Sequence, residues 1–316
     1  FFQNYIQNEG GIENLKRSNQ VLKDSQQNIR ENALFFLKRL ENLQEKKLID
    51  LASYIITRCF LVVVSTPDLD SAYRIFSVLN DRGLPLSHTD ILKAEIIGKI
   101  PPPYQDIYNT KWEDLETLLG REMFQNLFTH IRTIYRKVKS QDTILKEFRL
   151  YVRPTDNPQR FIDKVLKPYA DAFFTIKNSC YESIKSAEQV NSLLKWLNQI
   201  DNSDWIPPAM LYLPRNNDNP ERLLRFFVEL ERLAAGLMFL RANVNKRIER
   251  YSRLLTAVEN DDDLFAPDSP LQLTKEEQKD IIAYLDGNLY QSWFCKYVLL
   301  RLDETLAGSE ASYNYP

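Results

Sequence analysis

Residues 220–258 carry apolar side chains on two faces of a predicted helix, and this pattern constrains the fold more than any other feature of the chain. Both stripes follow helical steps of 3 and 4 residues; the first comprises Leu223, Phe227, Leu230, Ala234 and Leu237, and the second comprises Phe226, Leu233 and Leu240. A helix that is apolar on most sides has to be buried on most sides. The sequence therefore predicts one long helix at the centre of a bundle, opened by the segment DNPER at residues 218–222.

The chain beyond residue 103 continues the helical pattern almost without interruption. Further helices are predicted over residues 111–119, 121–138, 141–150, 158–177, 186–199, 205–213, 274–286 and 288–306. Thr274 and Glu277 form a T-x-x-E capping box at the start of one of them. The chain has 8 glycines in 316 residues, which leaves few of the turns that a β-sandwich or barrel requires. We therefore expect residues 101–316 to form an all-helical domain, with the PPP run at 101–103 as its boundary.

The first hundred residues mix two kinds of pattern. Two helices are predicted within residues 29–58, and others over residues 69–81 and 88–99. Between them, FLVVVST at residues 60–66 is short, apolar and β-branched, which is typical of a strand covered on both faces. The polar segment DSQQNIR at residues 24–30 is predicted to be a linker. The predicted fold class is mainly α, with an α+β N-terminal part that contains at least one buried strand and a helical bundle after it.

Composition argues against several kinds of site. The net charge is −2, so a global basic field for nucleic acid is absent, although a local basic patch remains open. The cysteines Cys59, Cys180 and Cys295 fit neither a zinc spacing nor a disulfide framework, which favours a reducing cytoplasm. No glycine-rich phosphate loop is present, and the histidines His88 and His130 make no metal-binding spacing, so no cofactor is expected in this chain. No run of about 18 apolar residues predicts a membrane span.

The stretch IFSVLNDRGLPLSHTD at residues 75–90 is predicted to be a corner between two helices. Ser87 has the position of an N-cap, and Asp90 at the third helical residue completes a variant of the capping box. Gly83 has the position just past the end of the preceding helix, in a Schellman ending. The residues that folding alone explains are Leu79, Gly83, Leu84, Leu86, Ser87, Asp90 and Ile91.

Four polar residues near this corner have no role in capping: Asn80, Asp81, Arg82 and Lys93. They are either solvated residues at a helix end or parts of a site. The layout also resembles a helix-turn-helix, but the turn is long and the helix HTDILKAEIIGKI offers few side chains that read bases. We therefore do not expect that helix to read DNA.

The segment AYRIFSVLNDRGLPLSHTDILKAEII closely resembles the signature of the GmrSD-type restriction endonuclease family, whose N-terminal domain is ParB-like. The matching positions are Phe76, Leu79, Asn80, Arg82, Gly83, Leu86, Ser87, Asp90, Leu92 and Lys93. The segments KWEDLETLLGREMF, DWIPPAMLYL and ANVNKRIERYSRLLTAVE resemble the helical middle of the family. The resemblance extends from about residue 30 to about residue 306.

This resemblance implies two domains, the C-terminal part of a ParB-like domain over residues 1–100 and a helical domain over residues 101–316. Complete members carry an Asp-Gly-Gln-Gln-Arg motif for nucleotide hydrolysis and often an HNH nuclease domain, and neither motif occurs here. The resemblance therefore implies the non-catalytic centre of a DNA endonuclease used in phage defence. It places Asn80, Arg82 and Lys93 at the nucleotide-binding half or between domains. Nucleotide and a divalent metal are expected only for the complete protein, without catalytic residues in this chain.

Residues 241–253 contain five basic residues and one acidic residue. Lys246, Arg250 and Arg253 follow steps of 4 and 3 and share one predicted helix face, with Arg247 and Arg241 nearby. Each lysine or arginine that neutralises a phosphate releases a counterion and favours DNA binding. Lys246, Arg247, Arg250 and Arg253 are therefore candidate DNA contacts; the alternative is a solvated helix end.

Two functions remain open at this point. The first is the central part of a modification-dependent endonuclease, whose partners are DNA, a preceding N-terminal segment and a following nuclease domain; a homo-oligomer is also compatible with it. The second is a helical protein-interaction module without a nucleotide or DNA role. Because the chain begins with FFQNYIQ rather than Met and ends at SYNYP, we expect a piece of a longer protein.

Overall fold

The structure is a computed structural model that describes residues 1–17, 22, 24–60 and 87–307. The chain divides into two compact units, Phe1–Asp68 and Leu69–Pro316. Both are helical, and the described ranges contain no strand, so the expectation of a mainly α fold is confirmed. The predicted division at residue 100 stays a prediction, because a compact unit and a sequence domain need not end at the same residue.

The first unit contains η1 (Gln3–Gln7), α1 (Gly11–Arg17), α2 (Asp24–Glu41) and α3 (Glu45–Arg58). The prediction of a linker at residues 24–30 is wrong, because these residues form the start of α2. Glutamine and arginine are good helix formers, so a polar segment can be helical when its neighbours continue the helix. The described part of this unit exposes several large apolar side chains: Phe35, Phe36, Ile49, Tyr54 and Ile56.

The predicted buried strand at residues 60–66 finds no support. Only Phe60 lies within the described residues, where it has no strand structure and is 86% exposed. Residues 61–66 and the predicted helix at 69–81 lie outside the described part of the chain, as do Asn80 and Arg82.

The second unit begins with α5 (His88–Gly98), α6 (Pro102–Leu119) and α7 (Arg121–Arg136). The capping box before α5 is confirmed, since the Ser87 hydroxyl accepts from the Asp90 N–H at 3.2 Å and the Asp90 carboxylate accepts from the Ser87 N–H at 2.8 Å. The expectation that α6 begins only at residue 111 is wrong: Pro101 is its N-cap and Pro102 its first residue. Proline lacks an N–H that the first turn leaves unpaired anyway, so it can begin a helix.

The middle of the second unit is helical where the sequence predicts it, but four short α-helical or π-helical pieces of four or five residues replace continuous helices. Its elements are α8 (Ile144–Glu147), η2 (Phe148–Val152), α9 (Pro158–Phe161), η3 (Ile162–Leu166), α10 (Lys167–Asn178), α11 (Ala187–Leu197) and α12 (Ile206–Arg215).

The long helix predicted over residues 220–258 is in fact two helices, α13 (Pro220–Phe239) and α14 (Val244–Glu259). The chain turns between them through Arg241, whose φ is 50°, and Asn243 caps α14 by accepting from the Lys246 N–H at 3.0 Å. Both predicted stripes of α13 are buried, except that Leu240 is only half-buried. The unit ends with α15 (Lys275–Leu285), which begins at the predicted Thr274 capping box, then η4 (Leu289–Gln291) and α16 (Cys295–Ala307).

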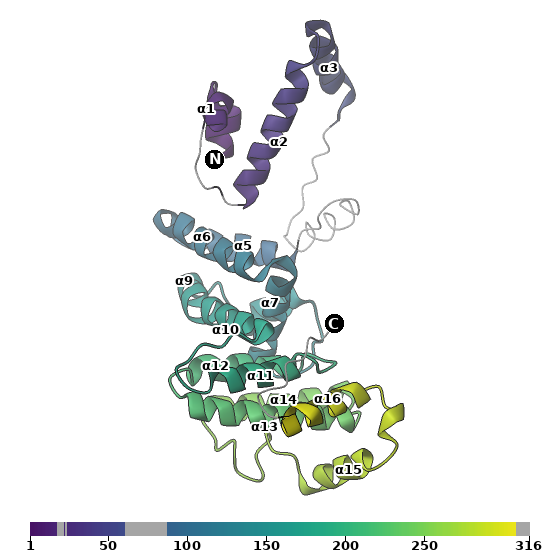
Figure 1. The fold of residues 1–316 in the computed structure, drawn as a ribbon. Coiled ribbons are helices and arrows are strands. Elements are labelled where there is room, and N and C mark those ends of the chain that lie inside the picture. Colours follow the sequence, from purple (N-terminus) through teal and green to yellow (C-terminus); the bar gives the residue numbers. More distant parts are fainter. Residues whose placement is uncertain (18–21, 23, 61–86, 308–316) are drawn as a thin grey trace. The chain divides into compact units, whose positions relative to one another are not determined.

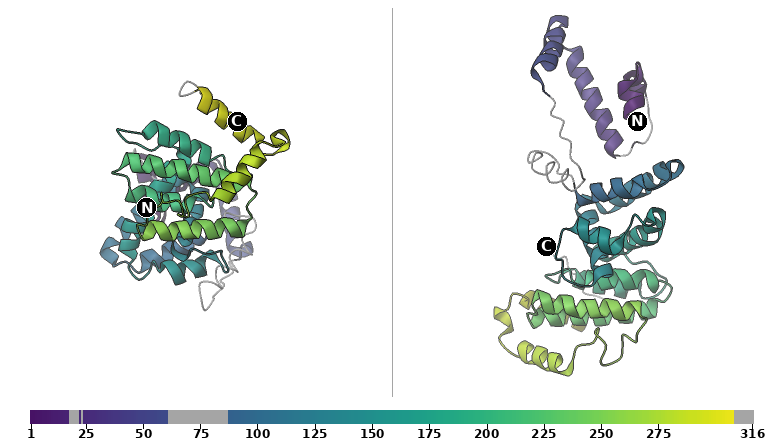
Figure 2. Two further views of the ribbon diagram at one scale, coloured as in Figure 1. Left: turned by 90° about the horizontal axis from the view of Figure 1, so that it is seen from below. Right: turned by 180° about the vertical axis from the view of Figure 1, so that it is seen from behind.

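From α5 to α14, the helices of the second unit form successive layers that follow the chain, and α16 returns to lie beside α13 (Figure 1). α10 packs on α12, α11 on α13, and α12 on α14, and the right-hand view of Figure 2 shows these layers from behind. Aromatic rings fill the spaces between layers; Tyr212 of α12 stacks on Phe226 of α13 with 3.8 Å between ring centroids. This packing places the C-terminal end of α7 beside α14, where the candidate site lies. In the described ranges, no helix is long and apolar enough to cross a membrane.

Candidate nucleic-acid interface

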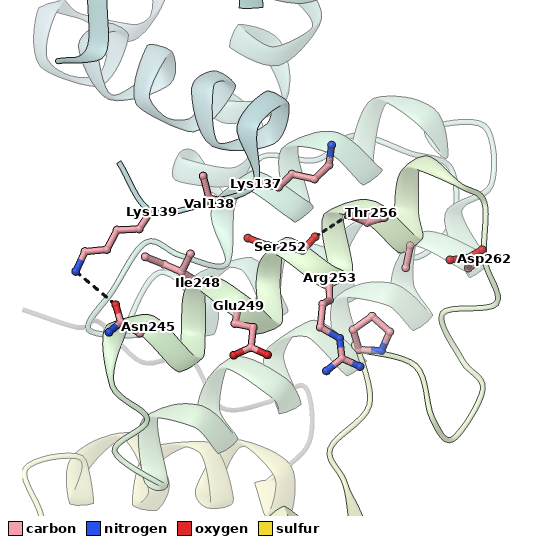
Figure 3. A pocket seen from close by; sticks show the side chains of 12 residues that line it. Lys137, Val138, Lys139, Asn245, Ile248, Glu249, Ser252, Arg253, Thr256 and Asp262 are labelled. Atoms are coloured by element: carbon pink, nitrogen blue, oxygen red, sulfur yellow. Dashed lines mark hydrogen bonds between the residues drawn. The ribbon is translucent and has the colours of Figure 1, made fainter. Parts of the chain in front are cut away.

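A groove with a volume of about 640 Å³ lies between α14 and the segment that follows α7 (Figure 3). The segment supplies Lys137, Val138 and Lys139, and α14 supplies a row of side chains at helical spacing. This row comprises Asn245, Ile248, Glu249, Ser252, Arg253, Thr256 and Ala257. Val138, Ile248, Ala257 and Pro270 give the groove apolar surface, and its other lining residues are polar or charged.

The segment after α7 is held in place by Glu147, whose side chain is only 1% exposed. Its carboxylate accepts backbone N–H groups of Gln141 at 2.8 Å and Asp142 at 3.1 Å. It also pairs with the guanidinium groups of Arg132 and Arg136 on α7. The turn is therefore tied to α7 and α8 at once, and this fixes where Lys137 and Lys139 emerge.

The surroundings of Glu147 stabilise its charged form. Burial on its own raises the pKa of Glu147, but the hydrogen bond from the Gln141 N–H and the pair with Arg132 lower it to about 2. The stabilisation by this carboxylate is consequently present at neutral pH. It is lost as the pH falls from the ordinary pKa of 4.5 towards 2.

The cations of the groove are distributed along it. Lys139 and Arg253 are exposed; the Lys139 ammonium lies 3.4 Å from the Asn245 side-chain oxygen. Lys137 pairs with Glu259 at 2.6 Å. In Figure 3, Lys137, Lys139 and Arg253 point in different directions instead of converging on one point. Such a spread suits successive charges of an extended anion better than one small anion.

Of the four predicted DNA contacts, Lys246 and Arg253 are exposed, and the other two are held by neighbouring residues. Arg247 donates to the Asp204 carboxylate at 2.7 Å and to the Ala242 carbonyl at 2.7 Å. Arg250 donates to the carbonyls of Pro270 and Gln272 at 2.8 Å each, and to the Glu277 carboxylate at 2.8 Å. DNA contact by these four residues stays a prediction, but Arg250 has a structural role that its helical spacing does not reveal.

Replacing Arg250 with alanine is expected to destabilise the second unit by about 3 kcal/mol, because three acceptors around residues 270–277 lose a charged donor. Chemical denaturation measures this change. Arg253→Ala is the matched control on the same helix, and we expect it to change stability by about 0.5 kcal/mol or less because the side chain is exposed. Equal effects of the two substitutions would show that the contacts of Arg250 contribute nothing.

A smaller pocket of about 120 Å³ adjoins the groove and shares Val138, Lys139, Ile248 and Ser252 with it. His130 and Arg132 of α7 line it on the inner side. Burial lowers the pKa of His130 to about 4, and the charge of Lys177 acts in the same direction, so this imidazole is neutral at pH 7. The pocket is large enough for a few ordered water molecules.

The remaining predicted site residue, Lys93, forms an ion pair with Glu113 of α6 at 3.1 Å. Glu113 also accepts from Asn109 at 2.8 Å, so Lys93 belongs to a polar network between α5 and α6. The roles predicted for Lys93, and for Asn80 and Arg82 outside the described residues, are not tested by this geometry. Within the described ranges, no group of three His, Cys, Asp or Glu side chains is placed to hold a metal ion.

Sequence reasoning did not identify Lys137 and Lys139 as partners of the basic helix. Lys139 is 106 residues away from Asn245 in the chain, and the packing of α12 against both α7 and α14 brings the two segments together. The run RKVKS at residues 136–140 is a local basic cluster at a helix end, and this is the one signal that the sequence contains.

Comparison with known proteins gives one match. The sequence model of the GmrSD restriction endonuclease N-terminal domain matches residues 1–97. No curated protein and no solved structure matches the chain. The match includes the Asn80–Lys93 region in which the sequence signature was found. The N-terminal part of the chain, residues 1–97, therefore matches the N-terminal domain of the GmrSD-type restriction endonuclease family.

Proposed function

We propose that this chain is the central, non-catalytic part of a DNA restriction endonuclease that acts in defence against phage. In this role, the N-terminal part belongs to a nucleotide-binding ParB-like half, and the helical unit connects that half to a nuclease domain and helps to hold DNA. The observation that carries the proposal is the match of residues 1–97 to the N-terminal domain of a restriction endonuclease family. Nucleotide and divalent metal would act in the complete protein, in the cytoplasm.

The groove between α7 and α14 is the surface that we assign to DNA. Exposed Lys139 and Arg253 line it, and exposed Lys246 lies next to the lining residue Asn245 on α14. Neutralisation of phosphates by such cations releases counterions. Glu249 and Asp262 also line or border the groove, so the local positive charge is modest. Contact with the phosphate backbone therefore accounts for weak, salt-sensitive binding, without reading of base sequence by these residues.

Charge reversal at Lys139 and Arg253 together tests this assignment. We expect the affinity of the 316-residue chain for duplex DNA at low salt to fall roughly tenfold or more, because two phosphate contacts become repulsive. The matched control is Lys185→Glu with Lys195→Glu, which makes the same charge change at exposed positions outside the groove. Affinity measured by fluorescence anisotropy should remain near the wild-type value in the control. An equal loss in both double variants would show that net charge, and not the groove, determines binding.

A helical protein-interaction module is the second candidate. The number of large exposed apolar side chains on α2 and α3 favours it, since exposed apolar surface can mark a contact between proteins. A chain of this second kind would bind no DNA at low salt, and the charge reversals would then have no effect.

A further inference from the structure

A second cavity, of about 360 Å³, lies where α13 ends and where the chain approaches α16. It combines one exposed aromatic ring with two guanidinium groups. Its principal lining residues are Trp293, Arg241, Arg247, Asp201, Leu237 and Met238. It shares none of its lining with the groove between α7 and α14, so it requires its own explanation.

Trp293 differs from the other three tryptophans of the chain. Its side chain is 56% exposed, whereas Trp112, Trp196 and Trp205 are at most 3% exposed. The next residue, Phe294, is buried and meets the Trp293 ring edge-on at 5.6 Å between centroids. The indole is thus attached to the core on one side and presents free ring surface beside the cavity. Packing of this unit does not require a large exposed indole.

The two arginines beside Trp293 are positioned by the turn between α13 and α14. Arg241 occupies the left-handed position of that turn and is exposed. Arg247 is anchored through its Nε and one Nη1 hydrogen by Asp204 and Ala242. A guanidinium has five N–H donors, so Arg247 has donors beyond those two bonds. Asp201 is the one acid among the lining residues, and Asp204 already balances the charge of Arg247. The cavity therefore offers guanidinium N–H donors of both arginines rather than a strong net positive charge.

We propose that this cavity binds a nucleobase that carries a phosphate, with the base stacked on Trp293 and the phosphate bonded by Arg241 and Arg247. Every base has a π-face that an indole can cover, and guanidinium groups match phosphate oxygens in pairs. A paired base hides its face inside the duplex, so the occupant is an unpaired base of a DNA strand or a free nucleotide. For an unpaired base of a DNA strand, the inference rests on the proposed function and adds a site for single-stranded DNA to it.

The position of Trp293 supplies a direct probe. Because the other three tryptophans are buried, stacking of a base quenches the emission of Trp293 alone. We would titrate the 316-residue chain with an eight-nucleotide oligothymidylate, with an abasic deoxyribose-phosphate strand of the same length, and with thymidine monophosphate. We expect saturable quenching by the oligothymidylate and none by the abasic strand. Saturable quenching by the monophosphate as well identifies a free nucleotide as a sufficient ligand, whereas quenching by the oligomer alone identifies a strand.

Substitutions then assign the signal to the cavity. Trp293→Phe should remove the quenching while preserving the emission of the buried tryptophans, which also shows that the fold is intact. Trp293→Ala should weaken binding of the oligothymidylate about fivefold to hundredfold, the range found when one stacking aromatic is removed. Arg241→Gln should weaken binding and reduce its salt dependence, and Lys185→Glu should change neither.

The outcomes separate this inference from the proposed function. If the oligothymidylate quenches Trp293 but Lys139 and Arg253 have no role in duplex binding, the base site at Trp293 is supported and the assignment of the groove to duplex DNA is contradicted. Duplex binding through the groove with no quenching by either nucleotide ligand would overturn the base site alone. Equal binding of the abasic strand and the oligothymidylate would also overturn it, and would leave Trp293 as a contact for another protein.

Discussion

Replacing Glu147 with glutamine should lower the free energy of unfolding of the second unit by about 3–5 kcal/mol. Glutamine has the same shape, but it leaves the buried guanidinium group of Arg132 and the partly buried one of Arg136 without a counter-charge. One guanidinium nitrogen of Arg132, Nη2, is buried without a hydrogen-bond partner among the described residues, so it has no alternative acceptor there. Thermal unfolding followed by circular dichroism should show a decrease in Tm of about 10 °C.

The matched control for this substitution is Glu182→Gln, which removes an exposed glutamate. A change of about 0.5 kcal/mol or less is expected there. Because Glu147 also fixes the turn that carries Lys137 and Lys139, Glu147→Gln should weaken DNA binding even at a temperature where the chain remains folded. Unchanged stability with Glu147→Gln would contradict the account of how the groove is built.

Acidification from pH 7 to pH 5 should cost the second unit about 2 kcal/mol through His130 alone. The pKa of His130 is about 4 in the folded protein and 6.5 ordinarily, so the unfolded chain binds the proton first as the pH falls. The stabilisation is complete above pH 6.5 and is lost progressively down to pH 4. Urea denaturation at pH 7 and pH 5 measures this difference in the free energy of unfolding. Between the two pKa values of His130, each pH unit corresponds to about 1.4 kcal/mol.

Burial also lowers the pKa of His88 and so adds a contribution of the same sign. The comparison is therefore between wild type and His130→Gln, a neutral side chain that does not titrate. Between pH 7 and pH 5, the free energy of unfolding of His130→Gln should fall by about 2 kcal/mol less than that of wild type, whatever the stability of the variant at pH 7. His88→Gln should retain the decrease that is due to His130. An identical pH dependence in wild type and His130→Gln would show that the imidazole is protonated in the folded protein at pH 5.

Local signals explain which elements of the fold the sequence predicts well. The caps of α5 and α15 depend on side chains three residues apart. The pairs Ser87 with Asp90 and Thr274 with Glu277 can therefore be recognised from the sequence without knowledge of tertiary contacts. The break between α13 and α14 is missed, because the apolar stripe continues to Leu240 and nothing in the sequence requires the positive φ of Arg241. The start of α6 is not predicted, because proline interrupts a helix at interior positions, whereas Pro102 stands at the first position, where proline is accepted.

The candidate site depends more on tertiary contacts than the helices do. Periodicity correctly places Lys246 and Arg253 on exposed positions of α14. It cannot show that Arg250, between them, bonds to a loop 20 residues away in the chain, nor that Lys139 reaches the same groove. Spacing along a helix defines direction around its axis, whereas exposure depends on the elements that pack there.

The salt dependence of duplex binding tests the central claim most directly. Each lost phosphate contact reduces the slope of log association constant against log salt concentration by about 0.9. The double variant of Lys139→Glu and Arg253→Glu should therefore show a slope that is smaller in magnitude by about 2 than that of wild type. The control Lys185→Glu with Lys195→Glu should retain the wild-type slope. Wild-type slopes in both variants would contradict a DNA-holding groove between α7 and α14.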